Sequence, residues 1–198
     1  MIDSFFNSIE KISKRNGALD AYSLQLVMDE DSGASIILCE PLTLASEFPE
    51  TTGLWLFEGI SDEEATLLLQ DFLCKRNHCT FELNRHFARL LAVKGWCVKK
   101  ELLALLEQFD WESYASPSVL LAALPQLPNG VDRILQLLDV VPTDARDGLF
   151  TACWYCTDNR VQQALQAHFN VWKTDSSWGN GDMEDLWFEV FSKKWKAE

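Results

Sequence analysis

The sequence predicts a mainly α-helical protein, built as an irregular, HEAT-like α-solenoid in which antiparallel helical hairpins stack side by side. Three observations lead to this class. From residue 61 onward, apolar residues recur at the i, i+3 and i+4 spacing of an amphipathic helix. Short polar turns separate these segments, and helix starts recur at roughly 13 to 19 residues, which gives a two-helix unit of about 30 to 37 residues. No repeat signature accompanies this spacing, so a compact, non-repeating helical bundle is the alternative architecture.

The length of the chain fits one domain. At 198 residues and 22.6 kDa, a single domain over residues 1–198 can bury a substantial core. Three parts are expected within this domain. An acidic N-terminal part covers 1–60, the array of helical hairpins covers 61–172, and a C-terminal closing helix covers 183–196.

The N-terminal part combines one clear helix with an ambiguous region. Met1–Arg15 shows the apolar stripe of an amphipathic helix. Ala18–Met28 can form a further helix, but Ala34–Cys39 and Gly53–Phe57 are short apolar runs, rich enough in Ile, Leu and Trp to form strands. Periodicity does not decide such short runs. Helices are favoured over 18–60, and a small β-hairpin or a mixed α+β opening is the alternative.

The helical array opens with a capping box, in which Ser61 is followed by Glu64. The helix that it starts is expected to end near Asn77, and Gly95 is placed to end the second helix in the left-handed conformation. The later helices of the array are expected at 80–94, 98–111, 116–124, 131–141, 142–156 and 157–172. After a polar stretch, Met183–Lys194 carries aromatic residues at helical spacing and is expected to close the core.

Composition limits the function classes. Thirty acidic against 17 basic residues give a net charge of −13, which repels nucleic-acid phosphates and attracts basic proteins. No apolar run approaches the roughly 18 residues that span a bilayer, and the N-terminus lacks the features of a secretory signal. We therefore expect a cytoplasmic protein with reduced cysteines that binds neither nucleic acid nor membrane.

The acidic residues are concentrated in the first third of the chain. Between Asn16 and Cys74 there is no Lys, Arg or His. This base-free stretch has two interpretations: evenly solvated carboxylates that keep the protein soluble, or a negative docking face whose aromatic anchors and carboxylates suit a basic partner. The second interpretation makes these residues the candidate partner-binding set: Asp29, Glu30, Asp31, Glu40, Glu47, Glu50, Trp55, Glu58, Asp62 and Glu63.

Two groups of cysteine and histidine residues have spacings that resemble reactive or metal-binding sites. Cys153 and Cys156 form a Cys-x-x-Cys, but they follow no βαβ pattern and share an apolar helical face, which favours buried packing. A looser group near one helical hairpin offers only one pair with zinc-ligand spacing, so core and turn positions are favoured there as well. This group consists of Cys74, His78, Cys79, His86 and Cys97.

The sequence offers little for acid–base catalysis. Glu82 and His86 lie four residues apart on one helical face, a spacing that could orient an imidazole but is also a routine helix-stabilising pair. His168 lies on an apolar face and is expected in the core. We therefore expect no catalytic residue, no cofactor and no metal ion, and predict that the protein is not an enzyme.

These features together resemble the bacterial immunity proteins that neutralise a cognate toxin in contact-dependent inhibition and related systems. The resemblance is one of type: a small, acidic, helix-rich chain with Trp-rich segments and no diagnostic motif. It implies a basic toxin domain as partner, most often a nuclease, that is inhibited when its active site or substrate surface is covered. The alternative function is a cytosolic helical-repeat adaptor without inhibitory activity. The sequence does not indicate the oligomeric state.

Overall fold

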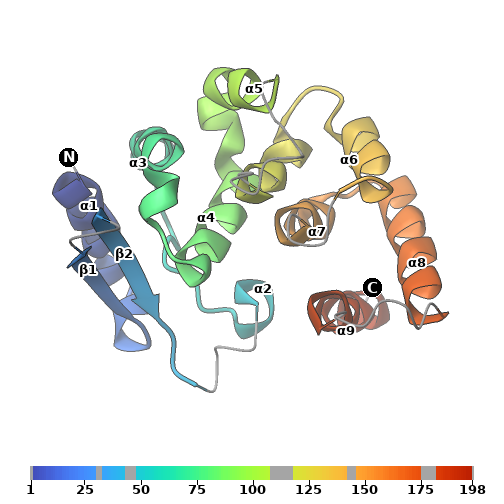
Figure 1. The fold of residues 1–198 in the computed structure, drawn as a ribbon, viewed down its shortest axis with the longest axis horizontal. Coiled ribbons are helices and arrows are strands. Elements are labelled where there is room, and N and C mark those ends of the chain that lie inside the picture. The colour runs from blue at the N-terminus through green and yellow to red at the C-terminus, as the bar shows by residue number, and fades with distance from the viewer. Residues whose placement is uncertain are drawn as a thin grey trace.

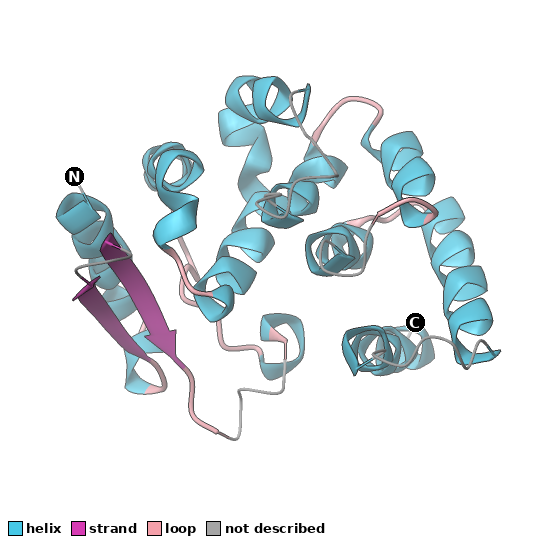
Figure 2. Ribbon diagram, viewed as in Figure 1, coloured by secondary structure: helices cyan, strands magenta, loops and turns pink. Residues whose placement is uncertain are grey.

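The computed structural model describes residues 2–29, 33–42, 48–107, 118–141, 146–174 and 182–197, and within them the fold is mainly helical (Figures 1 and 2). Short 3₁₀ helices, labelled η, connect several of the α-helices. In chain order the elements are α1 (Ile2–Arg15), η1 (Ala18–Asp20), β1 (Ser23–Asp29), β2 (Gly33–Cys39), α2 (Pro49–Thr52), α3 (Asp62–Lys75), η2 (Arg76–His78), α4 (Phe81–Lys94), η3 (Gly95–Val98), α5 (Lys99–Glu107), η4 (Ser118–Gln126), α6 (Gly130–Leu138), α7 (Arg146–Tyr155), α8 (Asn159–Thr174) and α9 (Asp182–Ala197).

The mainly helical class is confirmed, but the HEAT-like stack of helical hairpins is not. The short helix η4 packs between α4 and α7, and its residues from Val119 to Leu124 are all buried. The C-terminal helix α9 returns toward the N-terminal half, where Trp187 stacks on Phe48 with ring centroids 4.2 Å apart. These contacts join elements that are distant in the sequence, whereas a solenoid repeat contacts mainly its neighbours.

The helix favoured for Ala18–Met28 is wrong, and the alternative hairpin is confirmed. After the single turn η1, strand β1 pairs antiparallel with β2 in a register that places Leu26 opposite Ile36. The physical reason is that side chains in a strand alternate between its two faces. Leu24 and Leu26 pack against the core, and the residue between them is exposed. Gly53–Phe57 forms no strand, since it follows α2 as a turn and loop that starts at a left-handed Gly53 with φ 68°.

Most of the predicted helices form close to their expected bounds. The capping box of α3 is present, with Ser61 accepting from the Glu64 N–H at 3.2 Å and the Glu64 carboxylate accepting from the Ser61 N–H at 3.1 Å. Gly95 is not left-handed, since its φ is −57°. The position is closely packed, because a Cβ atom there would lie 3.2 Å from the Ala123 side chain. The expected start of one helix at Ser116 lies outside the described residues, as does the start expected at residue 142.

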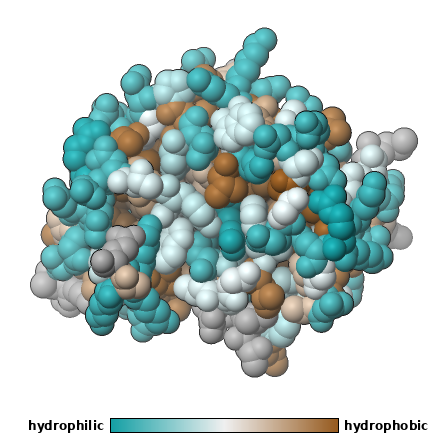
Figure 3. All heavy atoms as spheres, turned by 180° about the vertical axis from the view of Figure 1, so that it is seen from behind, coloured by the Kyte–Doolittle hydropathy of each residue, from teal (hydrophilic) through white to brown (hydrophobic). Residues whose placement is uncertain are grey.

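Two aromatic groups form the centres of the core. In the N-terminal half, Phe72 and Phe87 stack with centroids 4.0 Å apart. In the C-terminal half, Phe169 and Phe191 lie 6.0 Å apart, and Trp187 is fully buried beside them. On the face shown in Figure 3, hydrophobic side chains are scattered among hydrophilic ones. Within the described ranges, no helix combines the length and the apolar character needed to cross a membrane.

Candidate functional site

The ten candidate partner-binding residues separate into three groups in the structure. Glu58, Asp62 and Glu63 are exposed, and Trp55 is half-buried. Glu40 and Glu50 place carboxylate atoms in the interior. Asp29 is the last residue of β1, and three candidates lie outside the described residues. These three are Glu30, Asp31 and Glu47.

Hydrogen bonds tie together the segments that carry the exposed carboxylates. The side-chain amide of Asn16, just after α1, donates to the carbonyl oxygens of Leu56 at 2.8 Å and Glu58 at 3.2 Å. The end of α1 is also bonded to the start of α3, since the Arg15 guanidinium donates to both carboxylate oxygens of Glu64 at 2.6 and 3.1 Å. The loop before α3 is thereby held beside η1.

We name the exposed carboxylates of these segments the acidic corner, which consists of Asp20, Glu58, Asp62 and Glu63. Bases from outside the base-free stretch neutralise part of the surrounding charge, as Lys94 pairs with Asp62. The hydrogen bond from Arg15 lowers the pKa of Glu64 to about 2, with a further contribution from the Ser61 N–H. Within the described part of the chain, Asp20, Glu58 and Glu63 make no ion pair.

Glu40 is not a surface carboxylate, which corrects the expectation from sequence. Only 3% of its side chain is exposed, and its two oxygens lie 3.7 Å from Arg85 Nη1 and 3.6 Å from His86 Nε2. A backbone N–H from Leu56 donates to His86 Nδ1 at 3.4 Å. This bond places the proton of the neutral imidazole on Nε2, facing Glu40. The partner of His86 is therefore Glu40 rather than Glu82, and neither ring nitrogen is open to a substrate.

Burial explains the ionisation of His86. The ring is fully buried, and desolvation lowers its pKa, although Glu40 acts in the opposite direction. The rings of Tyr22 and His86 pack in a T-shaped arrangement with centroids 5.2 Å apart. His86 is therefore a neutral core residue that connects the end of β2 to α4 and to the loop at Leu56.

Glu50 is the second candidate docking residue whose expected surface position is corrected by the structure. Its Oε1 atom is buried without a hydrogen-bond partner among the described residues, and burial raises the pKa of this carboxyl to about 7. The charges of Arg89 and Arg85 lower the pKa, whereas Asp147 raises it. A carboxyl group in this setting is not a docking charge on the surface.

Trp55 has an intramolecular partner. The guanidinium of Arg89 lies over its ring, 4.5 Å from the centroid, and also donates to the Pro49 carbonyl oxygen at 3.0 Å. Arg89 therefore already occupies one face of the ring that was expected to anchor a partner. The exposed residues Glu58 and Gly59 come a little later in the same segment.

These corrected residues belong to one buried polar centre between the two halves of the core. The centre is formed by Glu40, Glu50, Arg85, His86, Arg89 and Asp147. Asp147 lies on α7 and accepts a 2.9 Å hydrogen bond from Trp187 Nε1 on α9, while burial raises the pKa of its carboxyl. The centre therefore connects β2, α2 and α4 with the C-terminal helices.

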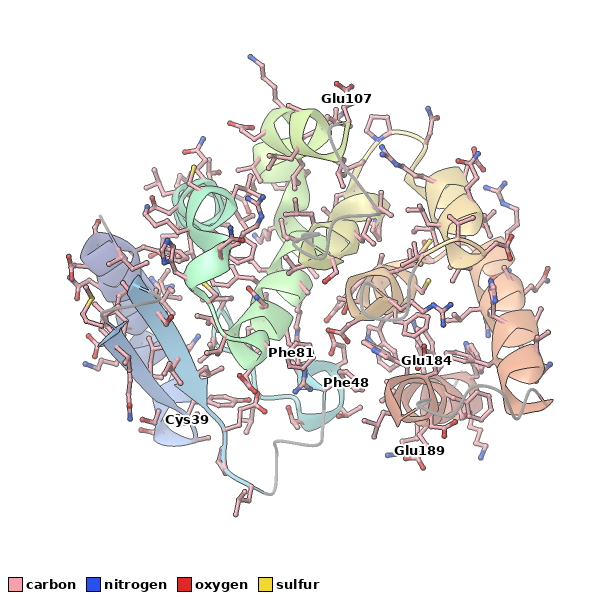
Figure 4. The ribbon with its side chains drawn as sticks, in the orientation of Figure 1. Cys39, Phe48, Phe81, Glu107, Glu184 and Glu189 are labelled. Atoms are coloured by element: carbon pink, nitrogen blue, oxygen red, sulfur yellow. The ribbon has the colours of Figure 1, made fainter. Side chains whose placement is uncertain are left out.

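A second buried ion pair supports the same junction. Arg146 donates to Glu184 at 2.9 Å and to the Val141 carbonyl oxygen at 3.1 Å. Glu184 lies on the side of α9 that faces α7, whereas Glu189 is exposed on the opposite side (Figure 4). Sequence reasoning missed Arg146, Asp147 and Glu184. The available signal was weak, because a charged residue at a helix end is usually solvated.

Several of the cysteine and histidine residues lie in buried or hydrogen-bonded settings. Burial raises the pKa of the Cys153 thiol, and it raises that of Cys79 to about 12, which disfavours the thiolate in both cases. His78 Nδ1 contacts the Ala34 carbonyl oxygen at 2.6 Å, and His168 lies 3.3 Å from Asp139. Nowhere in the described ranges do three His, Cys, Asp or Glu side chains gather in a way that could hold a metal ion.

No protein family, curated protein or solved structure matches this chain. The resemblance to immunity proteins is therefore a hypothesis that depends on the sequence features alone.

Proposed function

We propose that this protein is an immunity protein that binds a basic toxin domain through the acidic corner and neutralises it by covering its active site or substrate surface. The observation that carries the proposal is the set Asp20, Glu58 and Glu63, three exposed carboxylates without an ion pair among the described residues. Hydrogen bonds from the end of α1 anchor the loop that carries Glu58 and the start of α3 that carries Glu63.

Electrostatics favours a nuclease domain as the partner. A nuclease surface is positive where it binds phosphates, and a negative protein surface can occupy the same place. The net charge of −13 adds a long-range attraction that accelerates encounter at low salt. The partner's charge then accounts for both recognition and inhibition, because the residues that bind the corner are those that would bind the substrate.

The test starts from co-expression of the tagged protein with the product of the gene immediately beside its own. We expect a basic protein to be retained at fixed stoichiometry, to be released as the salt concentration rises, and to harm cells when it is expressed alone. A protein that purifies without a partner would contradict the immunity function. A retained partner that is harmless alone would favour the adaptor.

The site is tested by charge reversal. Glu58→Lys together with Glu63→Lys is expected to slow association about tenfold at low salt, with a smaller effect at high salt. The matched control reverses Glu107 and Glu189, two exposed carboxylates outside the corner. Equal slowing by both double variants would mean that only the net charge matters, and the acidic corner would not be the binding site.

A further inference from the structure

Strand β1 lies at the outer side of the hairpin, with β2 between it and the helices α3 and α4 (Figure 1). The far edge of β2 is occupied by the segment that enters α4. There the Ile36 carbonyl oxygen accepts from the Thr80 N–H at 3.1 Å, and the Leu38 N–H donates to Thr80 Oγ1 at 3.4 Å. The Ala34 carbonyl oxygen contacts His78 Nδ1 on the same side.

These bonds determine which backbone groups of β1 point outward. In an antiparallel pair, residues whose N–H and C=O point away from the partner strand lie opposite residues that do the same. Ala34, Ile36 and Leu38 point away from β1, and the register places them opposite Met28, Leu26 and Leu24. The N–H and C=O groups of Leu24, Leu26 and Met28 therefore face the outer edge. No described residue forms a hydrogen bond with them.

Among the described residues, the edge lacks the sequence and pairing features that normally prevent pairing. Protected edge strands contain Lys, Pro or a bulge, or are covered by another element. The sequence from Ser23 to Asp29 has neither Lys nor Pro, and its register with β2 is continuous. Met28 is 71% exposed and Val27 is 37% exposed at the same end of the strand. An unprotected edge of this length is suited to adding one further strand.

We propose that an extended, basic segment of the partner adds to β1 as a third strand, bonding to the backbone of Leu24, Leu26 and Met28. This inference rests on the proposed function and specifies how the partner is held. The acidic corner begins at Asp20, just before β1, so one partner chain can contact the corner and then continue along the strand.

Charge complementarity identifies a basic segment rather than a second copy of this chain as the occupant. Exposed Asp20 precedes one end of β1, and Asp29 is the last residue of the strand at the other end. Pairing of two β1 strands would bring the same acidic ends of two molecules together, which is unfavourable. A segment with Lys or Arg at its ends would instead meet opposite charge at both.

Amide hydrogen exchange tests the edge directly, with a synthetic peptide of alternating Lys and Val as the probe. In the free protein, the amides of Leu24, Leu26 and Met28 should exchange faster than those of Gln25 and Val27, which bond to β2. The peptide should slow exchange at the first three by about tenfold or more, and a matched peptide of alternating Glu and Val should not. Equal protection of these amides by both peptides, or protection by neither, would overturn the inference. Protection that increases with protein concentration in the absence of peptide would also overturn it, because it would indicate pairing between copies of this chain.

A pair of variants separates this inference from the proposed function. Met28→Pro removes one outward N–H from an exposed position, whereas Met28→Ala keeps the N–H and removes the side chain. Met28→Pro is expected to weaken partner binding about tenfold relative to Met28→Ala, with slow exchange at Gln25 and Val27 showing an intact hairpin. Equal binding by the two variants, while reversal at the acidic corner still slows association, would reject strand addition and retain the proposed function.

Discussion

The acidic corner and the buried polar centre both contain carboxylates from the base-free stretch. Those of the corner are exposed, whereas those of the polar centre are buried. Glu58 and Glu63 are exposed without an ion pair among the described residues, whereas Glu40 is buried between Arg85 and His86. The difference comes from α4, which contributes the bases that the stretch itself lacks. Glu40 becomes structural beside the bases of α4, whereas Glu58 and Glu63 remain available to a partner.

The comparison shows that local acidity does not identify a docking surface. A buried ion pair exchanges favourable hydration for a specific geometry, and it fixes which elements meet. At the polar centre the elements that meet are the end of β2, α2, α4 and α7. An exposed carboxylate in the corner contributes little to the stability of the fold. Its contribution is expected instead in the binding of a basic partner.

The largest expected difference between the two regions is in the free energy of unfolding. Arg85→Leu leaves the Glu40 carboxylate buried without the guanidinium that lies 3.7 Å away, which is expected to cost about 3 to 5 kcal/mol. Arg15→Leu removes the 2.6 Å contact with Glu64 in an exposed setting, where solvent screens the pair, and should cost much less. Urea unfolding at pH 7 measures both values.

The pair can be tested further with a double variant. Arg85→Leu combined with Glu40→Gln removes both charges, so it should lose less stability than Arg85→Leu alone. If Arg85→Leu cost no more than Arg15→Leu, the interior of the polar centre would be as well hydrated as the surface, contrary to the burial of Glu40.

A smaller effect is expected from Glu50, and it depends on pH. The folded-state pKa of about 7 lies above the ordinary value of 4.5, so the folded protein binds more protons than the unfolded chain between these values. The unfolding free energy therefore falls as the pH rises from about 4.5 through 7. Glu50→Gln removes this loss and should stabilise the protein by about 1 to 3 kcal/mol more at pH 8 than at pH 5. Urea unfolding of both proteins at the two pH values measures the difference.

Glu58→Gln is the matched control for the loss of one carboxylate from the exposed region. If Glu50→Gln changed stability equally at pH 5 and pH 8, the carboxyl group would be solvated in the folded protein. That outcome would remove Glu50 from the polar centre and return it to the candidate docking residues.

Sequence reasoning succeeded where the determinant is local. Ser61 and Glu64 form a capping box within one turn, so the start of α3 could be read directly. It failed at β1, because a run as short as Leu24 to Met28 fits a helix or a strand, and pairing with β2 decides between them. It also failed at Glu40, whose burial depends on Arg85 from a different element.

The smallest expected effect is on the stability of the acidic corner, and it makes the binding test interpretable. Glu58→Lys with Glu63→Lys should change the free energy of unfolding by no more than about 0.5 kcal/mol, because both side chains are exposed and lack an ion pair with any described residue. Thermal unfolding beside the wild-type protein measures this. A loss of several kcal/mol would show that these carboxylates serve the fold, as Glu40 does, and slower partner association by the variant could then no longer be assigned to a docking surface.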